Sequence, residues 1–270
     1  MKDIRVAAIT CEAPVGEIEQ NIDTAVAWAR KAKKAGADLV CFPELNISGY
    51  CNRPEISESA LPIPGAPTDQ LSRLAEEQNI TVLCGVAEHN PSGLPFAAHC
   101  AFTAEGDIQI YRKLHIAPPE KMTYAAGDRI RVFRSAGICF GIQLCYDAHF
   151  PELSSIMTEK GMEVLFVPHA SPRGTAQQKH QSWLRHLTAR AYDNSVFVIA
   201  CNQIGDNCNG LTFPGNAMAI SPSGEVIASD TQPQSSMLLV DLKASELTEV
   251  RNHPMRHFFP NRRPELYSKK

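Results

Sequence analysis

Three side chains that together could perform nucleophilic catalysis stand directly after apolar stretches of the chain. Glu44 follows LVCFP, Lys113 follows IQIYR, and Cys145 follows ICFGIQL. A thiol nucleophile needs a base that accepts its proton, and its attack on a carbonyl or nitrile carbon needs a cation beside the oxyanion that forms. Each of these residue types is common in purely structural roles, but as a set they would supply nucleophile, base and cation.

The surrounding pattern predicts elements that place these residues at one edge of a sheet. Residues 4–9 and 38–42 are short apolar stretches typical of buried strands, and residues 17–35 between them repeat apolar side chains along one helix face. This order indicates a βαβ unit, after which Glu44 lies at the carboxyl end of a strand. Sheets of this class present functional groups to a crevice at that end.

Further elements follow along the whole chain. We expect helices over 67–79, from Pro151 to Gly161, and, as one unbroken helix, over 175–193; strands over 80–87, 163–167 and 196–201; two short strands within 97–112; and hairpins within 130–144 and around 221–224. The mixture of βα units and antiparallel hairpins predicts an α/β protein. Because no linker or low-complexity segment interrupts the pattern, we expect one domain over residues 1–270.

The composition excludes several classes of function. The chain has 270 residues, of which 44% are hydrophobic, and its formal net charge of -3 is unlike the basic excess of a nucleic-acid-binding protein. No stretch approaches the roughly 18 apolar residues of a membrane helix, and the short apolar run near the N-terminus does not predict a secretory signal. We therefore expect a soluble, cytoplasmic protein that binds a small-molecule substrate and neither nucleic acid nor membrane.

The nine cysteines do not form a metal-binding or redox pattern. Their spacing contains no CxxC pair, which disfavours a zinc ribbon or a thioredoxin-type site. In a reducing compartment most of them are expected to be small buried hydrophobic residues. Cys145 differs from the others because a base and a cation accompany it.

Three segments carry a resemblance to a known family. FPELNISGY (42–50), YRKLHI (111–116) and LCYDAHFPE (144–152) occur in this order at wide separation and resemble the nitrilase, or carbon-nitrogen hydrolase, superfamily. Further segments resemble the family across nearly the whole chain: PPEKMTYAAGD (118–128), SPRGT (171–175), ARAYDNSVFVIACNQIG (189–205), GNAMAISPSGEVIA (215–228) and RRPELY (262–267).

The resemblance implies a fold, an assembly and a chemistry. The fold would be a four-layer αββα sandwich with two central mixed sheets flanked by helices, and the assembly a homodimer or a higher homo-oligomer built from dimers. The chemistry would be hydrolysis of a non-peptide carbon-nitrogen bond through a thioester acyl-enzyme, with no metal and no organic cofactor.

The resemblance also assigns roles to the catalytic residues. Cys145 falls on the nucleophile, Glu44 on the general base and Lys113 on the cation that stabilises the tetrahedral intermediate. Glu120 falls on an additional glutamate that many members place beside the nucleophile, against the alternative of a surface salt bridge. We expect the backbone N–H of Tyr146 to be an oxyanion donor together with Lys113.

The residues after the nucleophile favour an amide or N-carbamoyl substrate. Nitrilases proper usually carry Trp-Glu there, whereas many amidases and carbamoylases resemble this chain, which has Tyr146-Asp147. A small aliphatic amide or N-carbamoyl compound is therefore the predicted substrate. The alternatives are a nitrile, hydrolysed to the acid and ammonia, and a non-catalytic binding or scaffold member of the fold, against which the intact Glu44, Lys113 and Cys145 count.

Several further residues are candidates for the substrate pocket. Arg173 could bind a substrate carboxylate through a bidentate pair or serve in a structural ion pair. His115 is expected to support Lys113, and His180 and His186 to lie on exposed faces of the 175–193 helix. The other pocket candidates lie next to the family segments: Tyr50, Tyr124, His149 and Asn202.

Other enzyme classes lack their signatures in this chain. A papain-like hydrolase would carry a CGxC-type sequence around its cysteine. An α/β-hydrolase would carry GxSxG or GxCxG, and GIQLCYD lacks the second glycine. A dinucleotide-binding enzyme would carry GxGxxG after its first strand, and the chain has none there.

Overall fold

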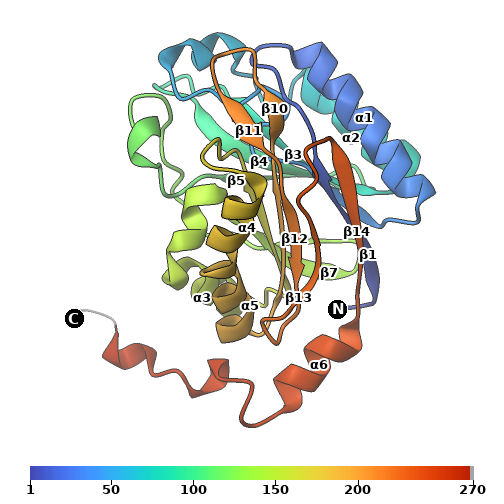
Figure 1. Ribbon diagram of the computed structural model, residues 1–270, viewed down its shortest axis with the longest axis vertical. Coiled ribbons are helices and arrows are strands. Elements are labelled where there is room, and N and C mark those ends of the chain that lie inside the picture. Colours follow the sequence, from blue (N-terminus) through green and yellow to red (C-terminus); the bar gives the residue numbers. More distant parts are fainter. Residues whose placement is uncertain (268–270) are drawn as a thin grey trace.

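Two six-stranded mixed sheets form the centre of the molecule in the computed structural model, which describes residues 1–267 (Figure 1). In the first, sheet A, the strand order is β14-β1-β2-β3-β4-β5, and β1, β2 and β3 run parallel while the other neighbours are antiparallel. Its strands are β1 (Ile4–Thr10), β2 (Leu39–Cys41), β3 (Thr81–Glu88), β4 (Phe96–Phe102), β5 (Ile108–Arg112) and β14 (Ser236–Leu242).

The second sheet, sheet B, has the order β13-β12-β9-β8-β7-β6, with β7, β8 and β9 parallel. Its strands are β6 (Phe133–Ser135), β7 (Ile138–Ile142), β8 (Val164–His169), β9 (Phe197–Asn202), β12 (Ala217–Ile220) and β13 (Val226–Asp230). A separate hairpin of β10 (Ile204–Asp206) and β11 (Thr212–Pro214) follows β9.

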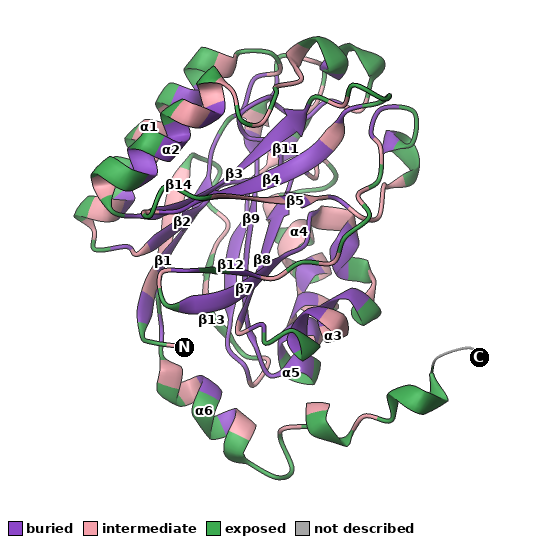
Figure 2. Ribbon diagram, turned by 180° about the vertical axis from the view of Figure 1, so that it is seen from behind, coloured by how far each residue is buried: buried purple, intermediate pink, exposed green. Residues whose placement is uncertain are grey.

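Helices cover the outer face of each sheet. On sheet A, α1 (Ile18–Lys34) and α2 (Ala66–Gln78) bury Ile22 and Leu71 against Val40 and Val82. On sheet B, α3 (Pro151–Glu159) and two further helices bury residues such as Leu153, which belongs to the same hydrophobic cluster as the sheet B strands. The strands are therefore mostly buried while the outer helix faces are exposed (Figure 2). The predicted four-layer αββα sandwich is confirmed.

One predicted helix is wrong. Residues 175–193 form two helices, α4 (Ala176–Leu184) and α5 (Leu187–Asn194), with a break at Arg185 and His186. The apolar spacing continues across the break because Trp183, Leu187 and Ala191 all face the core, so periodicity alone does not reveal it. The break turns the His186 ring inward against His149, with ring centroids 4.5 Å apart, and His186 is not on an exposed face as predicted.

The sequence pattern predicts neither β14 nor its pairing with β1 at the start of the chain. β14 pairs antiparallel with β1 along its full length, from Ile4 opposite Leu242 to Thr10 opposite Ser236. The helix α6 (Ala244–Asn252) follows, and the C-terminal segment then passes the ends of the sheet B helices, where Phe258 packs against Tyr192 and Arg262 pairs with Glu159 (Figure 1). Within residues 1–267, no helix combines the length and apolar character that crossing a membrane requires.

Candidate active site

The nucleophile candidate lies where the backbone leaves sheet B. After β7 the N–H of Gln143 still donates to the carbonyl of Phe166 at 2.9 Å, and a 3₁₀ turn, Cys145–His149, then begins. Cys145 has a φ of 45°, in the left-handed region that non-glycine residues rarely adopt. Such a conformation costs of order 1–3 kcal/mol and persists only where the surroundings fix it. Here it directs the partly exposed thiol out of the strand and into a pocket.

Asp147 provides the contacts that fix this turn. Its buried carboxylate accepts hydrogen bonds from the Tyr111 hydroxyl (2.8 Å), the Leu144 N–H (3.1 Å) and the His115 N–H (2.8 Å). The Nδ1 of His115 lies 2.7 Å from the same carboxylate. Because Tyr111 and His115 flank Lys113 in sequence, Asp147 joins the turn of the nucleophile to the segment that carries the lysine. His115 makes its polar contacts with Asp147, and so acts on Lys113 only through the backbone.

Replacing Asp147 by Asn should therefore loosen the site without removing any reacting group. All the groups that face this carboxylate donate, so an amide N–H₂ would oppose at least one buried donor, at a cost of about 1–3 kcal/mol. We expect Asp147→Asn to lower both the free energy of unfolding and kcat, measured by urea denaturation and steady-state kinetics. The matched control is Asp23→Asn on the exposed face of α1. If both variants behaved alike, this role of Asp147 would be wrong.

Lys113 lies fully buried between two glutamates. Its Nζ donates to Oε1 of Glu44 and to Oε2 of Glu120, each at 2.8 Å. Glu44 follows β2, and its Oε2 accepts the N–H of Ala170, which follows β8, at 3.1 Å. The carboxyl ends of strands from both sheets therefore meet at this point. An ammonium has three N–H donors, so one remains for a substrate oxygen.

Glu120 is part of this centre and is not a surface residue. It closes the 3₁₀ turn Pro118–Glu120, is buried, and accepts the Tyr50 hydroxyl at 2.8 Å as well as the Lys113 ammonium. The N–H of Ala117 donates to the same carboxylate at 3.2 Å. The alternative interpretation, a carboxylate in a surface salt bridge, does not fit this position.

Burial sets the protonation behaviour of the centre. It raises the pKa of Glu44 to about 7, against the opposing effect of Lys113 and with that of the Glu120 carboxylate. Burial disfavours the Lys113 ammonium, but Glu44 and Glu120 more than offset this and raise the lysine pKa. Burial and then the Glu44 carboxylate raise the pKa of the Cys145 thiol to about 12. The thiol is thus protonated at neutral pH, and Glu44 is a base that can take its proton near neutrality.

A cavity of about 640 Å³ opens above Cys145 and holds some of the predicted pocket residues. Tyr50, His149 and Arg173 line it, together with Glu120. Tyr124 and Asn202 lie outside its lining. Tyr124 donates its hydroxyl to the Cys51 carbonyl at 2.9 Å behind the wall. Asn202 is buried and fixes the backbone of Ser171, whose N–H donates to its Oδ1 at 2.8 Å.

Lys179 lies outside the lining of this cavity but contacts it through Ser171, and no pattern in the sequence distinguishes it. It extends from α4, and its Nζ donates to the hydroxyl of Ser171, which lines the cavity beside Arg173. Burial lowers the pKa of Lys179, and a thiolate on the nearby Cys145 would act in the opposite direction. Among residues 1–267, no carboxylate forms an ion pair with Lys179. No local motif distinguishes it, because α4 brings it to the site only through the fold.

Tyr146 occupies the first position after the nucleophile. Its backbone N–H belongs to the start of the 3₁₀ turn Cys145–His149, where the first N–H groups have no partner within the turn. Its ring packs edge-on against Phe150 at 5.4 Å and lines the cavity. This geometry leaves the role of oxyanion donor open to the N–H.

Comparisons with known proteins agree with this geometry. The family model for carbon-nitrogen hydrolases matches residues 5–252. An (R)-stereoselective amidase from Pseudomonas sp. is 30% identical over 70% of this chain and 68% of its own, and a nitrilase from Pyrococcus abyssi is 29% identical over 98% and 99%. The structure of an amidase from Nesterenkonia sp. superposes with a TM-score of 0.82 at 22% identity, over 98% of this chain and 95% of its own. The chain therefore belongs to the carbon-nitrogen hydrolase family and is a carbon-nitrogen hydrolase.

Proposed function

We propose that the protein hydrolyses a small aliphatic amide or N-carbamoyl compound through a thioester on Cys145. The observation that carries the proposal is the buried Glu44, with a pKa of about 7, held by Lys113 beside a thiol that opens into a substrate-sized cavity. The (R)-stereoselective amidase relative and the Tyr146-Asp147 pair support the choice of an amide over a nitrile.

The reaction can be written from these groups. Glu44 takes the thiol proton as sulfur attacks the carbonyl carbon, and the remaining N–H of Lys113 and the Tyr146 N–H stabilise the oxyanion. The C–N bond then breaks while Glu44 returns the proton to the departing nitrogen, which leaves as ammonia or an amine. Glu44 next deprotonates water, which forms a C–O bond to the thioester carbon as the C–S bond breaks, and the proton on Glu44 passes to the Cys145 sulfur as the acid leaves.

A substrate panel separates the alternatives. Purified enzyme is given aliphatic amides, N-carbamoyl amines and the matching nitriles, and ammonia, amine and acid are quantified. We expect turnover of amides or carbamoyl compounds. Turnover of nitriles alone would replace the proposal with the nitrilase alternative, which the Pyrococcus abyssi relative favours. No turnover of any class, with the fold intact, would favour a non-catalytic binding member.

The pH dependence should follow the Glu44 carboxylate. Because this base must be ionised and its pKa is about 7, log kcat/KM for a neutral amide should rise with a slope near 1 up to about pH 7 and then level off. The apparent value belongs to the whole Glu44-Lys113-Glu120 cluster. The Glu120→Gln substitution removes a carboxylate that raises the Glu44 pKa. In this variant the rise of log kcat/KM with pH should therefore occur at lower pH than in the wild type. If log kcat/KM of the wild type levelled off already below pH 5, the base would be a carboxylate with an ordinary pKa.

We further propose that Arg173 and Lys179 bind a carboxylate of the substrate. Arg173→Gln and Lys179→Gln should each raise KM for succinamate about tenfold relative to its neutral analogue butyramide, as expected when one hydrogen bond to a charged group is lost. Lys121→Gln, on the exposed surface, is the control. Equal changes of KM for both substrates would instead indicate structural cations.

The assembly and the compartment are also proposals. The C-terminal segment exposes Met255, Phe258, Leu266 and Tyr267, and a second copy of the chain would bury them in a homodimer. Light scattering should give a dimer mass for the full chain and a monomer mass after truncation at Asn252; a full-length monomer would contradict this.

The nine free cysteines and the need for a reduced Cys145 favour the cytoplasm.

A further inference from the structure

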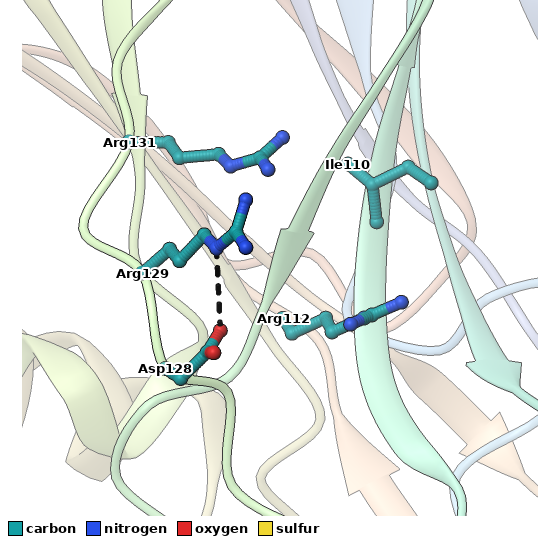
Figure 3. Close-up of a pocket in the computed structure, with 5 residues that line it drawn as sticks. All are labelled: Ile110, Arg112, Asp128, Arg129 and Arg131. Atoms are coloured by element: carbon teal, nitrogen blue, oxygen red, sulfur yellow. Dashed lines mark ion pairs between the residues drawn. The ribbon is translucent and has the colours of Figure 1, made fainter. Parts of the chain in front are cut away.

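A second pocket, rich in arginine, lies on the outer side of β5. It encloses about 230 Å³ between this edge strand and the segment 128–131 (Figure 3). Three of its five lining residues are arginines, although the chain as a whole has a net charge of -3. They are Arg112, Arg129 and Arg131, and Asp128 and Ile110 complete the lining.

The positive charge of this pocket is only partly neutralised. Arg112 donates from Nε and Nη2 to the two oxygens of Glu88, each at 2.6 Å. Arg129 has only a loose pair, with its Nε 3.8 Å from Asp128 Oδ1. Within residues 1–267, Arg131 has no ion pair or hydrogen bond. The pocket therefore retains one guanidinium without a counter-charge and another that is weakly held.

The guanidinium groups of Arg129 and Arg131 are aimed into the pocket. Figure 3 shows the Arg129 and Arg131 side chains extending from their segment toward β5, across from the Ile110 side chain. Planar guanidinium forks match the paired oxygens of carboxylates and phosphates. Ile110 offers an apolar surface to the part of a ligand that bears no charge.

Hydrogen bonds tether the backbone of the segment that carries Arg129 and Arg131. The N–H of Gly127 donates to the Lys113 carbonyl at 2.8 Å, and Lys160 Nζ donates to the Ile130 carbonyl at 2.9 Å. A Cβ at Gly127 would lie 2.6 Å from the Arg112 carbonyl oxygen, so glycine permits this close approach. The backbone beside Arg129 and Arg131 is therefore tethered before a ligand arrives, while both arginine side chains are exposed to solvent.

We propose that this pocket is a second ligand site, separate from the cavity at Cys145, which binds a small organic oxyanion: a carboxylate or phosphate ester with a short aliphatic part. Arg129 and Arg131 hold the anionic group, and Ile110 contacts the aliphatic part.

Calorimetric titration with inorganic phosphate and with succinate, at ionic strength held constant with chloride, tests this site. We expect saturable binding of at least one probe, which also tells a phosphate ligand from a carboxylate ligand. Arg131→Gln and Arg129→Gln should each weaken it about tenfold or more, the effect of losing a hydrogen bond to a charged group. Arg30→Gln, exposed on α1, is the matched control and should leave binding unchanged.

Arg173→Gln tells the two sites apart and needs no catalytic activity. Binding at the arginine pocket should be the same in this variant as in the wild type. The proposal is overturned if neither probe binds saturably, if the dissociation constant is unchanged in both Arg129→Gln and Arg131→Gln, or if binding is lost in Arg173→Gln instead. Thermal unfolding in chloride checks that each variant is folded.

Discussion

Replacing Cys145 by Ser should reduce kcat by about 10³-fold or more while leaving the fold intact, because loss of the nucleophile removes the covalent route. A base with a pKa of about 7 can take a proton from a thiol in concert with attack, but an alcohol holds its proton far more strongly. The side chain is partly exposed and its backbone conformation is unchanged by the substitution, so the free energy of unfolding should shift by less than about 1 kcal/mol.

Mass spectrometry gives this prediction a second readout. After brief exposure to substrate, the intact wild-type chain should gain the mass of the acyl group, and Cys145→Ser should not. Cys208→Ser is the matched control, because Cys208 is the exposed cysteine of the nine and lies away from the lining of the cavity. Full activity in Cys145→Ser, or the adduct on another cysteine, would rule out the proposed thioester.

The sequence predicts best those strands whose apolar composition alone indicates that they are buried. β7, β8 and β9 are continuous apolar runs, buried on both faces, and their positions are recognisable without knowing their neighbours. β14 is different because its first four residues are only half-buried. Its place beside β1 depends on a partner more than 200 residues away. No local pattern contains that information.

The residues proposed for catalysis can be located from the sequence for a similar reason, whereas the residues that support them cannot. Glu44, Lys113 and Cys145 lie in segments that resemble the family. Tyr124 and Asn202 lie in such segments too, yet the structure places them behind the cavity wall. Lys179 lies outside the segments that resemble the family. Its side chain reaches Ser171 in the cavity lining, eight residues earlier in the chain, because of the way the loop and α4 fold back.

Asp147 shows what a sequence pattern leaves out. In the sequence, Asp147 is one of the two residues after Cys145 that favour an amidase over a nitrilase. In the structure its carboxylate accepts hydrogen bonds from three residues of two segments, Tyr111 and His115 in one and Leu144 in the other, and it holds a left-handed residue in place. The type of residue was visible, but its role depends on which donors surround it.

Removing the charge of Lys113 should abolish activity and also weaken the fold. Lys113→Met deletes the cation that offsets two buried carboxylates, each 2.8 Å from its Nζ. Leaving buried charge uncompensated costs about 3–5 kcal/mol. Without the ammonium the pKa of Glu44 rises further, so protonation of this carboxylate at low pH relieves the penalty. The loss of unfolding free energy, measured against Lys121→Met as control, should therefore be larger at pH 8 than at pH 5.

A double variant separates the two roles of this lysine. In Lys113→Met/Glu120→Gln one of the opposing charges is also removed, so the free energy of unfolding at pH 8 should recover. Activity should not recover, because the oxyanion still lacks its cation and loss of one such donor costs about 2.7–4 kcal/mol of transition-state stabilisation. If the double variant regained both properties, Lys113 would serve the fold alone. If Lys113→Met unfolded like its control, the two carboxylates would not depend on the buried ammonium.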